Sequence, residues 1–209
     1  MSTVLAITSS ALGDASVSDK LVGDALTGLR ARDPGLEIIV RDLGRYPVPH
    51  LDADSATALR GAEPANPAQA AARALSDQMI AELRAADLIL IGAPMYNFGM
   101  TSTLKAWFDH VLRAGETFRY SAAGPQGLLE GKRALVIETR GGIYSEGPAQ
   151  AMDSQEPHLR TLLAFIGVSD VTFIRAEGLA IDADRRASAI EAARRELDRV
   201  TAEPLPEAA

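Results

Sequence analysis

The chain has 209 residues, of which 47% are hydrophobic and 23% charged, an ordinary globular composition that fits one domain over residues 1–209. Its formal net charge of −7 leaves no excess of basic residues for a nucleic acid or an anionic membrane surface, so neither partner is expected. It contains no cysteine, which excludes disulfides, thiolate-ligated metals and a cysteine nucleophile.

Five short apolar runs predict the strands of a sheet. The run Leu88–Ile91 shows no polar alternation, which is typical of a strand buried on both faces of a parallel sheet. In chain order, the expected strands are 3–8, 36–43, 88–91, 134–138 and 171–174.

The stretches between these strands have helical spacing. Residues 103–112 are the clearest case, because large apolar side chains recur there three, four, seven and eight residues after Leu104. The expected helices are 18–32, 68–86, 103–112, 159–166 and a last one marked by Ile190, Ala193, Leu197 and Val200. Two long connections, 44–67 and 113–132, are expected to be irregular excursions, and connections of this length often form lids or binding loops.

Strands that alternate with helices predict an α/β fold, a doubly wound parallel sheet with helices on both faces. We expect the flavodoxin-like version, with five strands in the order 2-1-3-4-5. Such sheets bind ligands at the carboxyl ends of their strands, near the point where the strand order reverses. The loops after the first, third and fourth strands would converge there.

The loop after the first strand is rich in hydroxyl groups. Neither GxxxxGK[ST] nor GxGxxG occurs, which disfavours a Walker ATPase and an ordinary dinucleotide-binding domain. Ser9, Ser10, Ser16 and Ser18 instead surround the start of the next helix, where hydroxyls, N–H groups and the helix dipole favour a phosphate. Ser16 and Ser18 are also suited to capping the helix, since Ser16 and Asp19 have capping-box spacing, and the two roles are compatible.

The loops after the third and fourth strands offer groups suited to a flat, heteroatom-edged ring. Pro94–Gly99 carries an amide, two aromatic rings and a thioether, which suits a flavin, and a plain strand-to-helix connection with core aromatics is the alternative. Thr139–Gly142 carries two adjacent glycines, which let the backbone approach a planar ligand. Their N–H groups would favour the negative charge of a reduced flavin near N1 and O2. A simple Gly–Gly turn is the alternative.

These segments are similar to those of the FMN-dependent NADH:azoreductases, also described as NADH:quinone oxidoreductases, a family of flavodoxin-like fold. The resemblance covers nearly the whole chain and is most specific at Pro94–Phe98, which Thr117–Tyr120 follows at a fixed distance. It implies one FMN per subunit. The residues that it implies for binding FMN are Ser10, Ser16, Val17, Ser18, Met95, Tyr96, Asn97, Phe98, Thr139, Arg140, Gly141 and Gly142.

The resemblance also implies an enzyme with NADH as electron donor and a ping-pong mechanism. NADH would reduce the flavin and leave, and the second substrate would then occupy the same face. Quinones would be reduced by two electrons and azo compounds cleaved reductively, in a homodimer with active sites at the subunit interface. Because the cofactor carries the chemistry, no side chain is assigned as catalytic acid or base. Residues 144–157 form a longer segment than in some relatives and are expected to reshape the pocket mouth.

Four further residues are candidates for contacting substrate. Arg60 lies in the first excursion and would meet an anionic group, unless it is simply a solvated loop cation. Phe118 and Tyr120 would line the pocket of the partner subunit, unless they only pack under their own loop. Phe165 would be a pocket wall, with core packing as its alternative.

Other functional classes find less support. His50, His110 and His158 lack the paired spacing of metal ligands, so no metal site is expected, and no GxSxG motif points to a serine hydrolase. No apolar run approaches the ~20 residues of a membrane span, and residues 1–10 lack the basic segment of a signal peptide, so we expect a cytoplasmic protein. The alternative function is a flavodoxin-like FMN electron carrier with protein redox partners. The two long excursions, which a carrier does not need, favour the enzyme.

Overall fold

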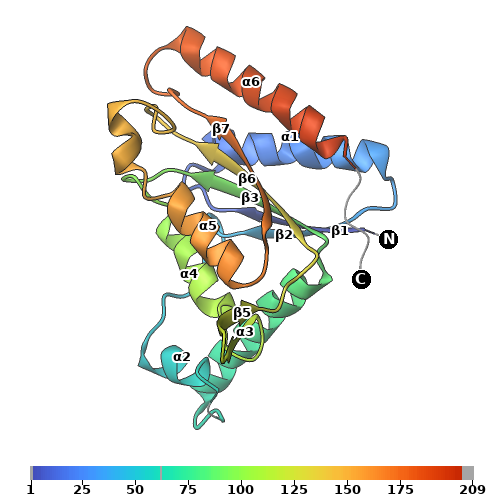
Figure 1. The fold of residues 1–209 in the computed structure, drawn as a ribbon, viewed down its shortest axis with the longest axis vertical. Helices are drawn as coiled ribbons and strands as arrows, with labels where there is room; N and C mark the ends of the chain where they lie inside the picture. The colour runs from blue at the N-terminus through green and yellow to red at the C-terminus, as the bar shows by residue number, and fades with distance from the viewer. Residues whose placement is uncertain (1, 62, 204–209) are drawn as a thin grey trace.

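The computed structural model describes residues 2–61 and 63–203, so the ends of the expected domain range and residue 62 lie outside the described residues. It contains a five-stranded parallel sheet with helices on both faces (Figure 1). The order β2-β1-β3-β6-β7 is the 2-1-3-4-5 order predicted from the sequence. The strands are β1 (Thr3–Thr8), β2 (Glu37–Asp42), β3 (Leu88–Pro94), β6 (Arg133–Thr139) and β7 (Asp170–Ala176).

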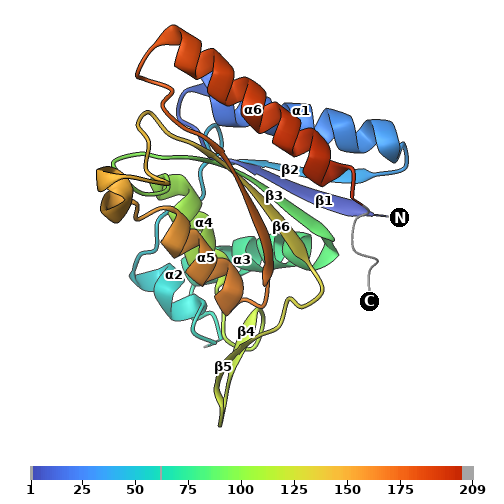
Figure 2. The same cartoon turned by 45° about the horizontal axis from the view of Figure 1, so that its top comes forward.

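The helices form two layers, one on each face of the sheet (Figures 1 and 2). The helices α1 (Val17–Arg32) and α6 (Ala183–Thr201) pack together on one face. The other face is covered by α3 (Pro67–Ala85), α4 (Ser102–Val111) and α5 (Glu156–Phe165). Among the described residues, no helix combines the length and the apolar character needed to cross a membrane.

Each face of the sheet has its own hydrophobic core, and β3 contributes to both. Ile89 and Ile91 belong to the core beneath α3, α4 and α5, whereas Leu88 and Leu90 belong to the core beneath α1 and α6. Successive residues of a strand point to opposite faces, so a strand covered on both sides must be apolar at every position. This confirms the interpretation of the unbroken apolar run in β3.

The two excursions contain regular structure, so the prediction that they are irregular was wrong in part. Residues 53–58 form the short helix α2 (Ala53–Ala58). Asp52 and Ser55 form a capping box at its amino end. Residues 118–127 form a hairpin of β4 (Phe118–Ser121) and β5 (Gly124–Gly127). One six-residue helix has too few turns to show a periodic apolar face, and β5 contains the glycine and proline that strands usually avoid. Two short 3-10 helices, Gly13–Ala15 and Pro148–Met152, were also not predicted.

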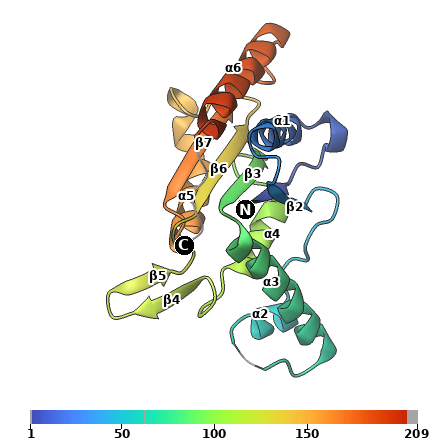
Figure 3. The same cartoon turned by 90° about the vertical axis from the view of Figure 1, so that its right-hand side faces the viewer.

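The hairpin projects from the end of the sheet at which the strands begin (Figures 2 and 3). The N–H of Leu129, just after β5, donates to the carbonyl of Ile166 at 2.9 Å, and both residues precede the starts of β6 and β7. The loops that follow β1, β3 and β6 lie at the opposite end. This separation decides which of the predicted site residues can meet within one chain.

Candidate functional site

Three loops meet at the carboxyl edge of the sheet, and we name them by their chemistry. The hydroxyl loop (Ser9–Ser18) follows β1, the aromatic loop (Met95–Phe98) follows β3, and the glycine loop (Thr139–Gly142) follows β6. Since β1, β3 and β6 are neighbouring parallel strands, their loops emerge side by side, at the position where open α/β sheets bind ligands.

Hydrogen bonds join the three loops directly. The N–H of Ala11 in the hydroxyl loop donates to the phenolic oxygen of Tyr96 at 3.1 Å. The N–H of Met95 donates to the carbonyl of Thr139 at 2.9 Å. The aromatic loop is therefore linked to both of its neighbours, and the three segments that carry the twelve residues predicted to bind FMN lie side by side.

The hydroxyl loop caps α1 and surrounds its amino end, where Ser16 and Ser18 are buried. Ser16 is the N-cap residue, and its Oγ accepts a hydrogen bond from the N–H of Asp19 at 3.1 Å. Ser18 makes no capping bond, because its hydroxyl lies 3.0 Å from that of Ser16 and donates to the Asp19 carboxylate at 3.2 Å. The capping interpretation is thus confirmed for Ser16. Val17 and Ser18 are the first residues of the helix, where backbone N–H groups have no partner within the helix and are suited to an anion.

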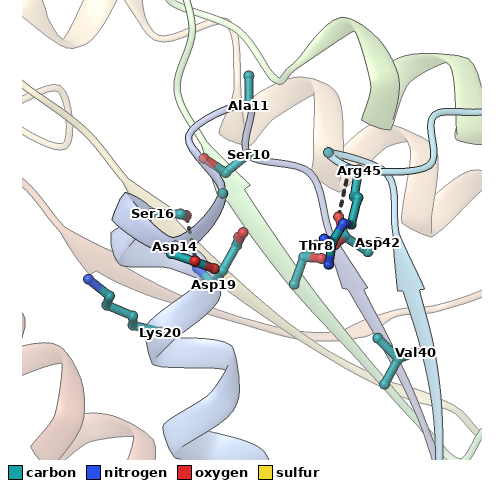
Figure 4. A pocket seen from close by; sticks show the side chains of 12 residues that line it. Thr8, Ser10, Ala11, Asp14, Ser16, Asp19, Lys20, Val40, Asp42 and Arg45 are labelled. Carbon is teal, nitrogen blue, oxygen red and sulfur yellow. Dashed lines mark hydrogen bonds between the residues drawn. The ribbon is translucent and has the colours of Figure 1, made fainter.

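An open cavity of about 840 Å³ lies between this loop and the end of β2 (Figure 4). Lys20 and Arg45 bring positive charge to it, and Asp19 is one of three carboxylates around it. Burial raises the pKa of Asp19, against the opposing effect of the hydrogen bonds from Ser16 and Ser18. Its lining residues are Thr8, Ser10, Ala11, Gly13, Asp14, Ser16, Asp19, Lys20, Val40, Asp42, Gly44 and Arg45. The cavity therefore adjoins the phosphate end of the predicted site, while the aromatic and glycine loops lie outside its lining.

The aromatic loop contains two consecutive residues with left-handed backbone. The φ angles are 48° at Asn97 and 71° at Phe98, an arrangement that is uncommon for any residue other than glycine and costs on the order of 1–3 kcal/mol per residue. Reciprocal backbone hydrogen bonds between Tyr96 and Gly99, at 2.9 and 3.1 Å, hold the turn in place. The turn leaves the side chains of Asn97 and Phe98 exposed at its tip. Strain of this kind is characteristic of ligand-binding segments.

The glycine loop presents a row of unpaired backbone donors. The carbonyl oxygens of residues 140–142 accept hydrogen bonds from the N–H groups of residues 178–180, at 2.8 to 3.1 Å. In a planar trans peptide the N–H points away from the C=O, so the N–H groups of residues 141–143 are directed away from that segment. Among the described residues none of these three N–H groups has an acceptor. Gly141 and Gly142 of the loop and Ile143 directly after it therefore present three N–H groups that are free to bind a ligand.

The side chain of Arg140 points into the protein rather than toward a ligand. Its guanidinium is fully buried and lies 2.7 Å from the carboxylate of Glu138, 3.0 Å from that of Asp153 and 3.0 Å from that of Glu177. Its Nε donates to Oε1 of Gln155 at 3.3 Å. Its backbone N–H and carbonyl are also bonded, to residues 176 and 179. Arg140 thus supports the glycine loop from below, and the expected direct contact with FMN stays a prediction.

Glu138 is the most perturbed group of this cluster. Burial raises its pKa to about 8, and the attraction of Arg140 offsets only part of that rise. Its Oε1 is buried with no hydrogen-bond partner among the described residues. The cluster holds three guanidinium groups and four carboxylates, so a proton on Glu138 brings its charges into balance. The members are Glu138, Arg140, Asp153, Glu156, Arg160, Arg175 and Glu177.

The sequence alone assigns no role to Glu138, Gln155 or Glu177. A signal existed for Glu138, because a carboxylate ends an apolar run that is predicted to be a buried strand. Gln155 and Glu177 carry no such signal, since glutamine and glutamate are ordinary residues of loops and helix ends.

Among the described residues, none of the four candidate substrate residues makes a hydrogen bond, ion pair or ring contact with the three loops. Phe118 is buried against Phe165, with ring centroids 4.5 Å apart, and against Tyr120 at 5.5 Å. This trio lies with the hairpin at the opposite end of the sheet. Within one chain Phe118 packs under its own loop, and its place in the pocket of a partner subunit stays a prediction. Tyr120 is 75% exposed. Arg60 is exposed in the turn after α2, whose helix packs on α3.

With the sheet order and the three loops established, the comparison with known proteins gives the class. Residues 2–200 match the family model described as "Flavodoxin-like fold", so the chain belongs to this flavodoxin-like family. Within it, the FMN-dependent NADH:quinone oxidoreductase of Hyphomonas neptunium is 50% identical over 200 residues, 96% of each chain. The enzyme of that name from Azotobacter vinelandii is 50% identical over 201 residues, 96% of this chain and all of the other.

Solved structures agree with the sequence relatives. The crystal structure of an FMN-dependent NADH-azoreductase from Bacillus anthracis in complex with FMN has a TM-score of 0.88 to this chain, with 26% sequence identity. The similarity covers 97% of this chain and 98% of that one.

Proposed function

We propose that this protein is an FMN-dependent oxidoreductase that uses NADH to reduce quinones and azo compounds. The names of the relatives at 50% identity and of the solved azoreductase support the cofactor, the donor and both substrate classes. The observation in this chain that carries the proposal is the set of three N–H groups without an acceptor, at residues 141–143 on and directly after the glycine loop, next to the strained aromatic loop.

The residues present fit FMN at each part of the molecule. The hydroxyls of Ser10, Ser16 and Ser18, with the N–H groups at the start of α1, would hold the phosphate. The aromatic loop and the glycine loop would hold the ring and its ribityl chain. When bound, FMN supplies two-electron transfer from NADH to the acceptor. The N–H groups of residues 141–143 would stabilise the negative charge that the ring gains on reduction.

One exposed face for both substrates supports a ping-pong mechanism. The side chains of Asn97 and Phe98 are exposed at the tip of the aromatic loop, with 41% of the Phe98 side chain accessible. NADH and the acceptor would each use this face in turn, so NAD must leave before the acceptor binds. No side chain of the chain is assigned as an obligate proton donor.

A homodimer would supply the residues that one chain does not bring to the site. The hairpin projects from the far end of the sheet and carries the exposed Tyr120, and Arg60 is exposed after α2 (Figure 3). A second copy that places these elements over the three loops would complete a substrate pocket. We expect such a dimer of single-domain subunits, located in the cytoplasm.

The visible absorption spectrum tests the proposal. The purified protein, or the apoprotein reconstituted with FMN, is expected to show flavin bands that bleach when NADH is added without oxygen. Addition of a quinone or an azo dye should then restore them. Flavin bands that NADH alone leaves unchanged would indicate an electron carrier that needs a protein partner. A protein that cannot be loaded with FMN would refute the proposal.

A further inference from the structure

We infer that Gln155 is a positioning residue that holds the aromatic loop and the glycine loop in a fixed arrangement around the flavin. The inference deepens the proposed function and rests on it. Gln155 lies in none of the three loops; it is the residue just before α5, 15 residues after Arg140 along the chain.

The side-chain amide of Gln155 bridges the ends of two neighbouring strands. It is fully buried. Its Nε2 donates to the carbonyl of Ala93 at 2.8 Å, two residues before the aromatic loop begins. Its Oε1 accepts from Nε of Arg140, within the glycine loop, at 3.3 Å. One amide therefore contacts the base of both loops.

The residues beside Gln155 extend this connection. The N–H of Ser154 donates to the carbonyl of Phe98 at 3.0 Å and so holds the tip of the aromatic loop. Asp153 accepts from the N–H of Gln155 at 2.9 Å and forms an ion pair with Arg140 at 3.0 Å. Residues 153–155 thus contact the aromatic loop at its base and tip, and the glycine loop through Arg140.

Glutamine has the chemistry that this position requires. Its side chain combines a donor for a backbone carbonyl with an acceptor for a guanidinium, and a carboxylate lacks the donor. An apolar side chain of similar size would leave Ala93 and Arg140 each without one buried partner, which is a substantial penalty for buried polar groups. Ala93 is fully buried, so water cannot readily replace the missing bond.

The rigidity of the two loops would affect how tightly the oxidised and the reduced flavin bind. The donors at residues 141–143 would favour the reduced state of a bound flavin, because a flavin gains negative charge on reduction. Looser loops would weaken the binding of both flavin states, and that of the reduced state more. The expected signature is therefore a lower midpoint potential together with weaker binding.

The test compares Gln155→Met with Gln150→Met, the same substitution at an exposed position five residues earlier on the same segment. In Gln155→Met, the dissociation constant for FMN should rise at least tenfold and the midpoint potential of the bound flavin should fall. For a two-electron couple, each further tenfold loss of affinity in the reduced state lowers the potential by about 30 mV. Gln150→Met should match the unsubstituted protein in both measurements.

Different outcomes would refute the positioning role of Gln155 and the proposed function. If the unsubstituted protein binds no FMN, the proposed function fails and this inference with it. If it binds FMN and Gln155→Met keeps the same affinity and potential, the inference is wrong while the function stands. Weaker binding with an unchanged potential would also overturn it, because an equal loss of affinity in both flavin states would not come from misplaced glycine-loop donors. If Gln155→Met does not fold, Gln155→Asn replaces it, because asparagine is one methylene too short to span both partners. Gln155→Asn is expected to show the same two changes. An FMN affinity and a midpoint potential equal to those of the unsubstituted protein would overturn the inference.

Discussion

Glu138 and Arg140 lie two residues apart at the end of β6, with both side chains fully buried and their charged groups 2.7 Å apart. Alternate residues of a strand point to the same face, which brings this pair together directly beneath the glycine loop. Arg140 also forms ion pairs with Glu177 and Asp153, so the buried Glu138–Arg140 pair is at the centre of the contacts that support the candidate site.

The raised pKa of Glu138 predicts that stability depends on pH. Its usual pKa is 4.5 and burial raises it to about 8, so between these values the folded protein holds a proton that the unfolded chain does not. Stability is therefore expected to fall as pH rises through this window, on the order of 1 kcal/mol per pH unit from this group. Glu156 and Glu177, whose pKa values are lowered, act in the opposite direction and mainly below pH 4.5.

Urea denaturation of the apoprotein at pH 5, 6, 7 and 8 measures this dependence. Glu138→Gln keeps the size of the protonated side chain and removes the titration, so its stability should vary less over the same range. An equal slope in both proteins would show that Glu138 is not the group responsible.

Substitutions of Ser16 and Ser18 distinguish helix capping from phosphate binding. Ser18→Ala should weaken FMN binding about tenfold, the loss of one charge-assisted hydrogen bond, and leave riboflavin binding unchanged because riboflavin has no phosphate. Ser16→Ala should weaken FMN binding too and also destabilise the protein by about 1 kcal/mol, because Ser16 caps α1. Titration with both flavins and thermal unfolding provide the measurements. If Ser18→Ala lowers affinity for both flavins alike, its hydroxyl does not contact the phosphate.

The left-handed backbone at Asn97 gives a sharp test of the aromatic loop. Asn97→Leu places a bulky apolar side chain on a residue with φ 48° and should weaken flavin retention severalfold, while the exposed position leaves the core intact. Asn97→Gly tolerates the same φ and should retain more flavin than the leucine variant. Flavin content after gel filtration and the far-UV circular dichroism spectrum measure the two effects. Unchanged flavin occupancy in Asn97→Leu would remove this loop from the site.

Gly44 sets how closely the chain after β2 approaches the hydroxyl loop. A Cβ at position 44 would lie 2.1 Å from the carbonyl oxygen of Ser10, so Gly44→Ala must displace one of the two segments. We expect a large loss of FMN affinity and a lower melting temperature. Gly23→Ala is the matched control, because its Cβ meets no atom within 4 Å and alanine favours the helix by about 1 kcal/mol. Equal FMN affinity in both variants would show that Ser10 does not depend on this close contact.

The strands and long helices could be predicted because their signals are local. β3 is apolar at each buried position, and α4 repeats its large apolar residues at helical spacing. The alternation of the two element types predicts a doubly wound parallel sheet, and the expected flavodoxin-like strand order is the one observed. The short α2 and the β4–β5 hairpin could not be predicted in this way, since neither contains enough residues of a typical pattern.

The sequence by itself determined the sheet, the helices that cover it and the three loops whose residue types suit a flavin. Hydrophobic periodicity and loop composition are signals from residues that lie close together in the chain. Only the tertiary structure decided that Arg140 turns inward, that Gln155 reaches Ala93 across 62 positions of the chain, and that Phe118 and Phe165 pack far from these loops. Buried polar groups must find partners wherever the folded chain supplies them, and those partners come from segments that the sequence separates.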